Sequence, residues 1–148
     1  VLIGARQYQI TADNMNYNYE VRTTSSYLSE KIRQNDSYDS FCITRLTEED
    51  GLISVDPNGD ISALAIYSTE GDRRYVTYIY CYDGFLRELF ISENASLALS
   101  SGQKLIAIHD LDITLCSEEL IYMQFTGTDG ISYPLYLSIH TGSGKEAL

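Results

Sequence analysis

RYVTYIYCYDGFLRELFI, residues 74–91, is the segment that decides the fold. Its first part, 74–82, is rich in tyrosine and β-branched residues and has apolar or aromatic side chains at both alternating sets of positions. That composition is typical of a strand in the centre of a sheet. Asp83-Gly84 follows as a strong hairpin signal, because a type I′ turn requires positive φ at both central residues. We therefore expect 85–91 to return as the antiparallel partner of 74–82.

Apolar residues alternate with other residues on both sides of this hairpin, which predicts further strands. An acidic loop at 47–60, which can hold a short strand at 52–55, and a polar loop at 93–103 interrupt them. Residues 120–126 are expected to pair with the last strand across Thr128-Asp129-Gly130. Pro134 removes a hydrogen-bond donor from that last strand, which predicts an edge position or a bulge there. The other expected strands are 40–46, 52–55, 61–68, 104–108, 111–116 and 131–138.

The N-terminal segment has a different period. Residues 1–34 contain no proline, and Gly4 is their only glycine. A set of mostly apolar residues recurs at steps of seven, four and three, which places them in one stripe along one side of an α-helix. A helix of this length would be about 50 Å long, and QNDSYDS at 34–40 would end it. The stripe consists of Ile3, Ile10, Tyr17, Val21, Thr24, Leu28 and Ile32.

These patterns predict an α+β fold in which a long N-terminal helix packs on an antiparallel β-sheet meander. The sheet is expected to have roughly five to seven strands. Residues 1–36 would be the amphipathic helix. Residues 37–142 would be the sheet of the same globular domain, and 143–148 a flexible tail.

Length and charge restrict the class of protein. A chain of 148 residues is one ordinary domain. Its formal net charge of -11 repels polyanions, so we expect no nucleic-acid partner. Three cysteines, Cys42, Cys81 and Cys116, are far apart in sequence and form no CxxC pair. A zinc site therefore has no support, and the odd number argues against a complete disulfide framework.

DPNGD, residues 56–60, places oxygen-bearing side chains at alternating positions, Asp56, Asn58 and Asp60. Calcium loops use such spacing, because Ca²⁺ takes six to eight oxygen ligands. An EF-hand would also need glycine at position six and glutamate at position twelve, where this chain has Ile61 and Tyr67. An EF-hand is therefore excluded. A calcium site of another type stays open, but a simple β-turn is the favoured interpretation.

The histidines and cysteines give a second set of candidates. His109 stands beside Asp110, Asp112 lies close by, and Cys116 follows; His140 is the other histidine. A thiol nucleophile needs a base and an electropositive setting, whereas this surrounding is acidic. We favour a loop histidine and strand cysteines that pack as small apolar residues.

Tyrosines are concentrated on two expected strands. An exposed tyrosine face could bind carbohydrate or protein by stacking and through its hydroxyl groups. The favoured alternative is that these rings fill the space between helix and sheet. We therefore predict no catalytic, cofactor-binding or metal-binding residues, no cofactor and no enzymatic activity. The tyrosines concerned are Tyr75, Tyr78, Tyr80, Tyr82, Tyr133 and Tyr136.

The N-terminal helix pattern resembles that of type IV pilins and pseudopilins, in which the first half of the helix spans the membrane. RTTSSYLSEKIRQND (22–36) looks like the helix-to-sheet passage of larger minor pseudopilins and competence pseudopilins. Together with NYEV (18–21) before it, RYVTYIYCYDGFLRELF (74–90) and YLSIHTG (136–142), it is similar to an uncharacterised family of single-span, membrane-anchored Firmicute proteins. The hydrophobic half of the helix and the prepilin cleavage motif are absent from this chain.

This resemblance implies a single-pass membrane protein with an extracytoplasmic globular domain. Val1, Leu2 and Ile3 would be the stub of the membrane span. The implied function is that of a non-enzymatic structural protein, including a minor pseudopilin-like subunit of a secretion or uptake filament. Its partners would be other pilin-like or membrane proteins, bound through the stripe Ile10, Tyr17, Val21, Leu28 and Ile32.

Two other classes stay open. One is a cell-surface binding module for glycan or protein that does not polymerise, which would have an exposed aromatic patch on its sheet. The other is an enzyme, which would need a concave site around His109 or His140.

Overall fold

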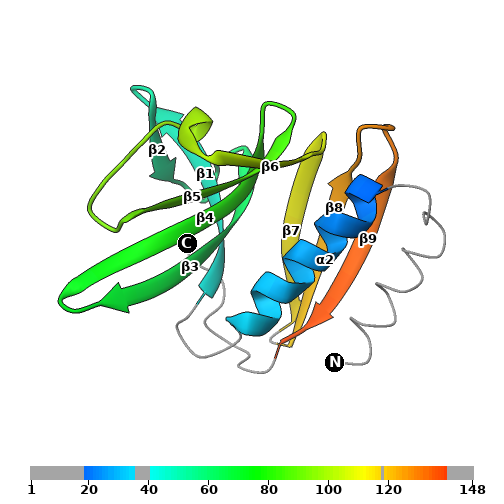
Figure 1. The fold of residues 1–148 in the computed structure, drawn as a ribbon, viewed down its shortest axis with the longest axis horizontal. Helices are drawn as coiled ribbons and strands as arrows, with labels where there is room; N and C mark the ends of the chain where they lie inside the picture. Colours follow the sequence, from blue (N-terminus) through cyan, green and yellow to red (C-terminus); the bar gives the residue numbers. More distant parts are fainter. Residues whose placement is uncertain (1–18, 36–40, 118, 140–148) are drawn as a thin grey trace.

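The protein folds into two antiparallel sheets and one α-helix in the computed structural model, which describes residues 19–35, 41–117 and 119–139 (Figure 1). The helix is α2 (Tyr19–Gln34), and a short 3₁₀ turn, η1 (Leu99–Ser101), precedes β6. The strands are β1 (Phe41–Glu49), β2 (Leu52–Val55), β3 (Ile61–Glu70), β4 (Arg73–Tyr82), β5 (Phe85–Ser92), β6 (Gln103–Ala107), β7 (Asp110–Ser117), β8 (Leu120–Thr126) and β9 (Ser132–Ser138).

The larger sheet has six strands in the order β2-β1-β3-β4-β5-β6. The prediction that 74–82 lies centrally is confirmed, because β4 pairs with β3 on one side and β5 on the other. The predicted type I′ turn is present, with φ of 51° at Asp83 and 82° at Gly84. A matching turn joins β1 to β2, with φ of 55° at Asp50 and 80° at Gly51. The expectation that the loop begins at residue 47 is wrong, because β1 continues to Glu49. The short strand expected at 52–55 is confirmed as β2.

The smaller sheet has the order β7-β8-β9. Residues 120–126 pair with the last strand as predicted. Pro134 lies on β9, which is an edge strand of this sheet, and it is opposite Gln124 of β8. Its position confirms the prediction, because a residue without an N–H group disrupts least at an edge. The chain passes from β6 to β7 through Ile108 and His109 alone, so the two sheets meet at a sharp corner.

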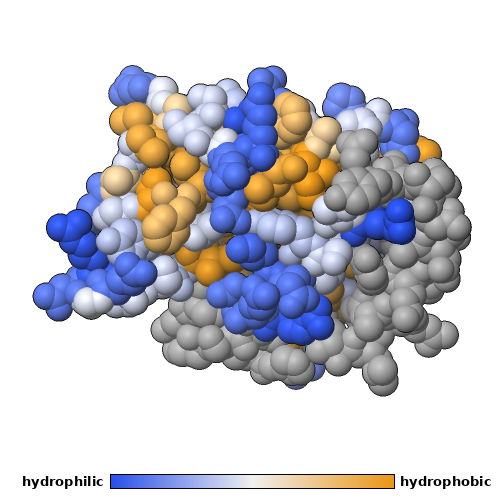
Figure 2. Space-filling model, in the orientation of Figure 1, coloured by the Kyte–Doolittle hydropathy of each residue, from blue (hydrophilic) through white to orange (hydrophobic). Residues whose placement is uncertain are grey.

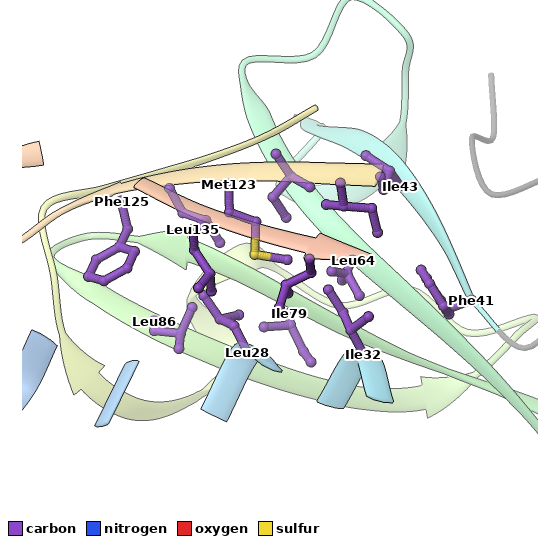
Figure 3. Close-up of a cluster of buried hydrophobic side chains, with 14 of the residues drawn as sticks. Leu28, Ile32, Phe41, Ile43, Leu64, Ile79, Leu86, Met123, Phe125 and Leu135 are labelled. Carbon is purple, nitrogen blue, oxygen red and sulfur yellow. The ribbon is translucent and has the colours of Figure 1, made fainter. Parts of the chain in front are cut away.

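The main hydrophobic core lies between the two sheets and α2. Figure 3 shows side chains from all three layers pointing toward one another. α2 contributes Leu28 and Ile32, the larger sheet Leu64 and Ile79, and the smaller sheet Met123, all at most 2% exposed. Each such side chain contributes roughly 1.5–3 kcal/mol relative to an exposed position. Most buried residues of this core lie on strands, so it is formed mainly by the packing of one sheet against the other.

A second hydrophobic core lies on the opposite face of the six-stranded sheet. It is closed by the segment 93–102 between β5 and β6, which we call the strap. Both faces of the larger sheet are consequently buried over much of their area, which is why β4 has apolar residues at both alternating sets of positions. The buried members of this core are Cys42, Leu46, Ala63, Ala65, Val76, Tyr80, Leu89, Ile91 and Leu99.

The prediction of a long N-terminal helix packed on one antiparallel meander is wrong. The fold is mostly antiparallel β-sheet, and α2 has 16 residues, which is about 24 Å of helix. The physical reason is that the strands bury residues from both faces, so a second sheet and the strap provide most of the cover. The stripe residues Val21, Leu28 and Ile32 are buried within this core.

Several predictions concern residues outside the described ranges. These are the stub Val1, Leu2 and Ile3, the stripe residues Ile10 and Tyr17, and the tail 143–148. The predicted helix stop is confirmed, because α2 ends at Gln34. Asn35 follows it and donates from Nδ2 to the carbonyl oxygen of Lys31 at 2.8 Å, which satisfies one of the last helical carbonyl groups. Within the described ranges no helix has the length and apolar character needed to cross a membrane.

Two side chains of α2 reach one carboxylate on β5. The hydroxyl of Tyr27 donates to Glu88, and Lys31 Nζ lies 3.4 Å from Glu88 Oε1. Burial raises the pKa of Tyr27, and the hydrogen bond to Glu88 raises it further. These contacts fix how the helix lies alongside β9 and the end of β6 (Figure 1).

Candidate interaction surface

The strap binds the outer edge of β2. The backbone N–H of Ile53 donates to the carbonyl oxygen of Leu97 at 2.8 Å. Ser96 Oγ donates to the carbonyl oxygen of Ile53 at 3.0 Å. The backbone N–H of Leu99 donates to Glu48 Oε2 at 2.9 Å, which adds a contact with β1. The strap is therefore held to the sheet at its middle as well as at its ends.

The underside of the strap rests on Tyr80 and Arg87. Tyr80 Oη donates to the carbonyl oxygen of Leu99 at 2.5 Å, and burial raises its pKa to about 12. Arg87 is only 4% exposed. Its Nη1 donates to the carbonyl oxygens of Ser100 at 2.9 Å and Gly102 at 3.3 Å. Burying a guanidinium without hydrogen-bond partners costs free energy. Displacing the strap would remove these two carbonyl partners from Arg87, so the buried arginine favours the strap in its observed position.

Three exposed apolar side chains lie on β2 and the strap. Leu52, Val55 and Leu97 are 46%, 48% and 43% exposed, and we call them the β2–strap patch. Figure 2 shows hydrophobic atoms over this end of the molecule, at the upper left. Leu52 and Val55 point to opposite faces of β2, so the patch wraps around the edge of the strand. Single exposed apolar residues are ordinary, whereas grouped ones mark contact surfaces.

The charge beside the patch has one sign. Residues 46–72 contain no lysine or arginine. Glu49 opposes Leu52 in the β1–β2 register, Asp50 lies in the adjoining turn, and Asp56 follows Val55. Together with Asp60 we call these carboxylates the acidic rim. The described ion pairs of the protein include none of these four groups.

The loop considered for calcium forms a turn. Asp56 Oδ1 accepts from the backbone N–H of Asn58 at 2.9 Å, and the Asp56 carbonyl oxygen accepts from Gly59 at 2.8 Å. Arg45 Nε donates to the Gly59 carbonyl oxygen at 2.6 Å and holds this turn against β1. Local hydrogen bonds of this kind are typical of Asx turns. Among the described residues, no cluster of three or more acidic, histidine or cysteine side chains could hold a metal ion.

The fold does not bring the histidine and cysteine candidates together. His109 is exposed at the corner before β7, and Cys116 is exposed near the other end of that strand. Seven residues of strand separate them by about 23 Å. Cys42 is buried, and burial raises the pKa of half-buried Cys81 to about 11. His140 lies outside the described residues.

The tyrosines fall into different environments. Tyr80 is buried in the second core, and Tyr133 is buried in the main core with its ring 5.7 Å from that of Phe125. Tyr136 instead points outward from the smaller sheet, where its ring centre lies 4.7 Å from that of Tyr122. The sequence analysis missed Tyr122. The predicted pairing of 120–126 with 131–138 contains the signal, because Tyr122 lies directly opposite Tyr136.

On the larger sheet, Tyr75 stacks on Phe90 with ring centres 5.1 Å apart, and Phe90 is 56% exposed. Tyr78 and Tyr82 are half-buried and pack against the second core. The tyrosines thus share no single face of the molecule.

Comparison with known proteins gives one match. The sequence profile of a family described as Domain of unknown function (DUF4860) matches residues 19–128, which is more than half of the chain. No curated protein and no solved structure matches significantly. The match begins at the first residue of α2 and includes the whole six-stranded sheet, the strap, β7 and β8. The chain therefore belongs to the family described as Domain of unknown function (DUF4860).

Proposed function

We propose that this protein is a non-enzymatic structural protein that makes protein contacts through the β2–strap patch. It is anchored in the cell membrane by a segment N-terminal to α2, with its globular domain on the extracytoplasmic side. The exposed apolar group Leu52, Val55 and Leu97 is the observation that carries the contact. The anchor and the location rest on the sequence resemblance. A filament subunit is one form of such a structural protein, and it rests on the resemblance alone.

The contact surface differs from the one expected first. Val21, Leu28 and Ile32 are at most 2% exposed and pack inside their own domain. They are therefore not available to a neighbouring helix. The patch lies on β2 and on a strap held at several points, so its side chains are pre-positioned for binding. Pre-positioned apolar side chains lose little conformational freedom when a partner covers them.

Site-specific photo-crosslinking of the full-length protein in its own cells tests this proposal. A photoreactive phenylalanine analogue replaces Val55 or Leu97, and the control replaces Asp72 at the exposed β3–β4 turn. We expect the same protein adduct from both patch positions, absent from the control and lost when Leu52→Asp is added. Equal adducts from all three positions, or none from the patch, would refute the contact. Fractionation of the same cells tests the location, since the domain should remain with the membrane and be cleaved by external protease.

A second candidate function is glycan binding on the outer face of the smaller sheet. Thr114, Tyr122 and Tyr136 lie in one row across the three strands, and Gln124 lies in the next row. Tyr122 Oη donates to Gln124 Oε1 at 2.9 Å. Half-exposed aromatic rings beside an amide group suit a sugar ring, which offers C–H groups to the rings and hydroxyl groups to the amide.

Titration of the protein with a panel of neutral oligosaccharides, followed by NMR, tests this candidate. Binding should be lost in Tyr122→Ala and kept in Tyr75→Ala, which removes an aromatic ring from the other sheet. Equal loss in both variants, or no binding by the unaltered protein, would eliminate it.

A further inference from the structure

We infer that the partner of the β2–strap patch is a protein segment in which lysine or arginine residues flank an apolar anchor. This inference rests on the proposed function, because it describes what binds to the same surface. The patch supplies the apolar contact, and the acidic rim supplies the charge that selects a cationic partner. Complementary charge around an apolar centre gives an interface its specificity and a high association rate.

Among the described residues, no ion pair includes a carboxylate of the acidic rim. The nearest basic residue before it in sequence is Arg45, whose guanidinium is already engaged. Arg45 donates to Gly59 and to Ser62 Oγ, and its Nη1 lies 3.9 Å from Asp112 Oδ1. The next one, Arg73, lies beyond the β3–β4 turn. A cationic partner would therefore meet carboxylates that no lysine or arginine of the described residues pairs with.

The rim also argues against other occupants. A second copy would bring its own rim against this one, and the chain has a net charge of -11. Like charges placed face to face in an interface oppose association. Nucleic acid and anionic lipid are repelled for the same reason.

The partner must bind mainly through side chains and not by adding a strand. The backbone N–H of Asp56 donates to the carbonyl oxygen of Arg45 on β1. Because every second residue of an antiparallel strand bonds to the same neighbour, the backbone groups of Ile53 and Val55 point away from β1. The strap already occupies those of Ile53. β2 has only four residues. The open edge is therefore too short for an added strand, which needs a row of free backbone groups.

Three synthetic peptides test the chemistry of the partner against the full chain. The first carries lysines around a central leucine-rich stretch, the second replaces the lysines with glutamates, and the third replaces the leucines with serines. We expect saturable binding of the first alone, weakening as salt is added. Equal binding of the lysine–serine peptide would mean that charge alone acts, and would overturn the apolar part of the inference.

A matched pair of variants locates the charge. The rim variant carries Glu49→Gln, Asp50→Asn and Asp60→Asn. The control carries Glu70→Gln, Asp72→Asn and Glu119→Gln, which remove the same charge from other exposed positions. Asp56 is left unchanged because it forms the turn. Binding should fall about tenfold in the rim variant and much less in the control. An equal fall in both would overturn the inference, because non-specific attraction to an acidic protein would explain it.

The two levels of the proposal fail differently. The photo-crosslinks at Val55 and Leu97 are repeated in the rim variant and at raised salt. If they persist unchanged, the contact surface stands and the cationic partner is wrong. If the unaltered protein gives no patch crosslink, the proposed function itself fails. Near-ultraviolet circular dichroism of each variant establishes that the fold is intact.

Discussion

Gly102 marks the tightest point beneath the strap. A Cβ atom at this position would lie 2.4 Å from Tyr80 Oη and 3.0 Å from Arg87 Cβ. Its φ of -64° is available to any residue, so the requirement for glycine comes from space and not from backbone conformation. Tyr80 is fully buried and hydrogen-bonded to Leu99, so its hydroxyl cannot move aside without losing that bond.

We therefore expect Gly102→Ala to lower the free energy of unfolding by about 1–3 kcal/mol, the range for overpacking of a core. In a Tyr80→Phe background the clashing oxygen is absent, so the same alanine should cost less. Urea denaturation of the two single variants and the double variant measures this. Strictly additive costs would contradict the proposed clash.

The three cysteines should differ in reactivity. Cys116 is exposed, Cys42 is buried, and Cys81 is half-buried with its pKa raised to about 11, mainly by burial. Because the thiolate is the reactive form, iodoacetamide at neutral pH should modify Cys116 first. Mass spectrometry of peptides from a short labelling of the native protein measures this order. Equal labelling of Cys81 would show that its environment is more open than the structure indicates.

At the scale of elements, the strap combines two roles in neighbouring residues. Leu99 is 2% exposed and fills the second core, whereas Leu97 is 43% exposed and belongs to the β2–strap patch. The two side chains have the same volume and lie on the same segment. They therefore form a matched pair that separates stability from binding.

Leu99→Ala should lower the free energy of unfolding by about 2–5 kcal/mol, because it leaves a cavity in a packed core. Leu97→Ala should change it by less than about 0.5 kcal/mol, as expected for an exposed site. Leu97→Ala alone should weaken partner binding while the fold is kept. Chemical denaturation and the patch crosslinks measure the two effects. Equal destabilisation by the two alanines would mean that the strap is not oriented as described.

The predictability of each element depended on whether its signal was local. Asp83-Gly84 needs positive φ, and Pro134 lacks an N–H group, so both announced their structures within a few residues. The strap carried a weaker local signal, because Leu97 and Leu99 alternate within a segment that otherwise has the composition of a loop. Its burial of Leu99 depends on Tyr80 and Glu48, which are distant in sequence.

The division into two sheets had no local signal. It is made at Ile108 and His109 and fixed by contacts such as Ser62 Oγ to Asp112 Oδ1 at 2.9 Å, between residues 50 positions apart. The helix stripe gave the correct buried side for Val21, Leu28 and Ile32. It could not indicate how much of the fold the strands would form by packing on one another. The contact surface was missed for a similar reason, since Leu97 lies beside β2 only after the strap has folded back.

For the molecule as a whole, one six-stranded sheet separates two hydrophobic cores. Several ionisable hydroxyl and thiol groups are packed around these cores in their neutral form. Burial is the main cause of the raised pKa of Tyr27, Tyr67, Tyr78 and Cys81, and of Tyr80 as well. The folded state thus favours the neutral forms of these groups, so the free energy of unfolding should decrease at alkaline pH.

The sign of this linkage follows from the two states. In the unfolded chain the pKa is 9.0 for cysteine and 10.0 for tyrosine. Folding raises the pKa of Cys81 to about 11 and that of Tyr80 to about 12. Their stabilising contribution is complete below pH 9 and is lost as pH rises through 11 and 12. We expect the urea midpoint to fall steadily above pH 9 and tyrosinate absorbance to rise with unfolding. Tyr80→Phe should reduce this slope, and a midpoint independent of pH would contradict the burial of these groups.

The strap also sets how freely this surface can evolve. A substitution at Leu97 alters the side chain offered to a partner while Leu99, two residues on, continues to fill the core. The backbone bonds between the strap and Ile53 do not depend on the identity of the residue at 97. Members of the family could therefore exchange one partner for another by drift at a few outward positions, without passing through an unstable ancestor. Binding preference and folding are inherited on the same ten residues, yet each can be selected separately.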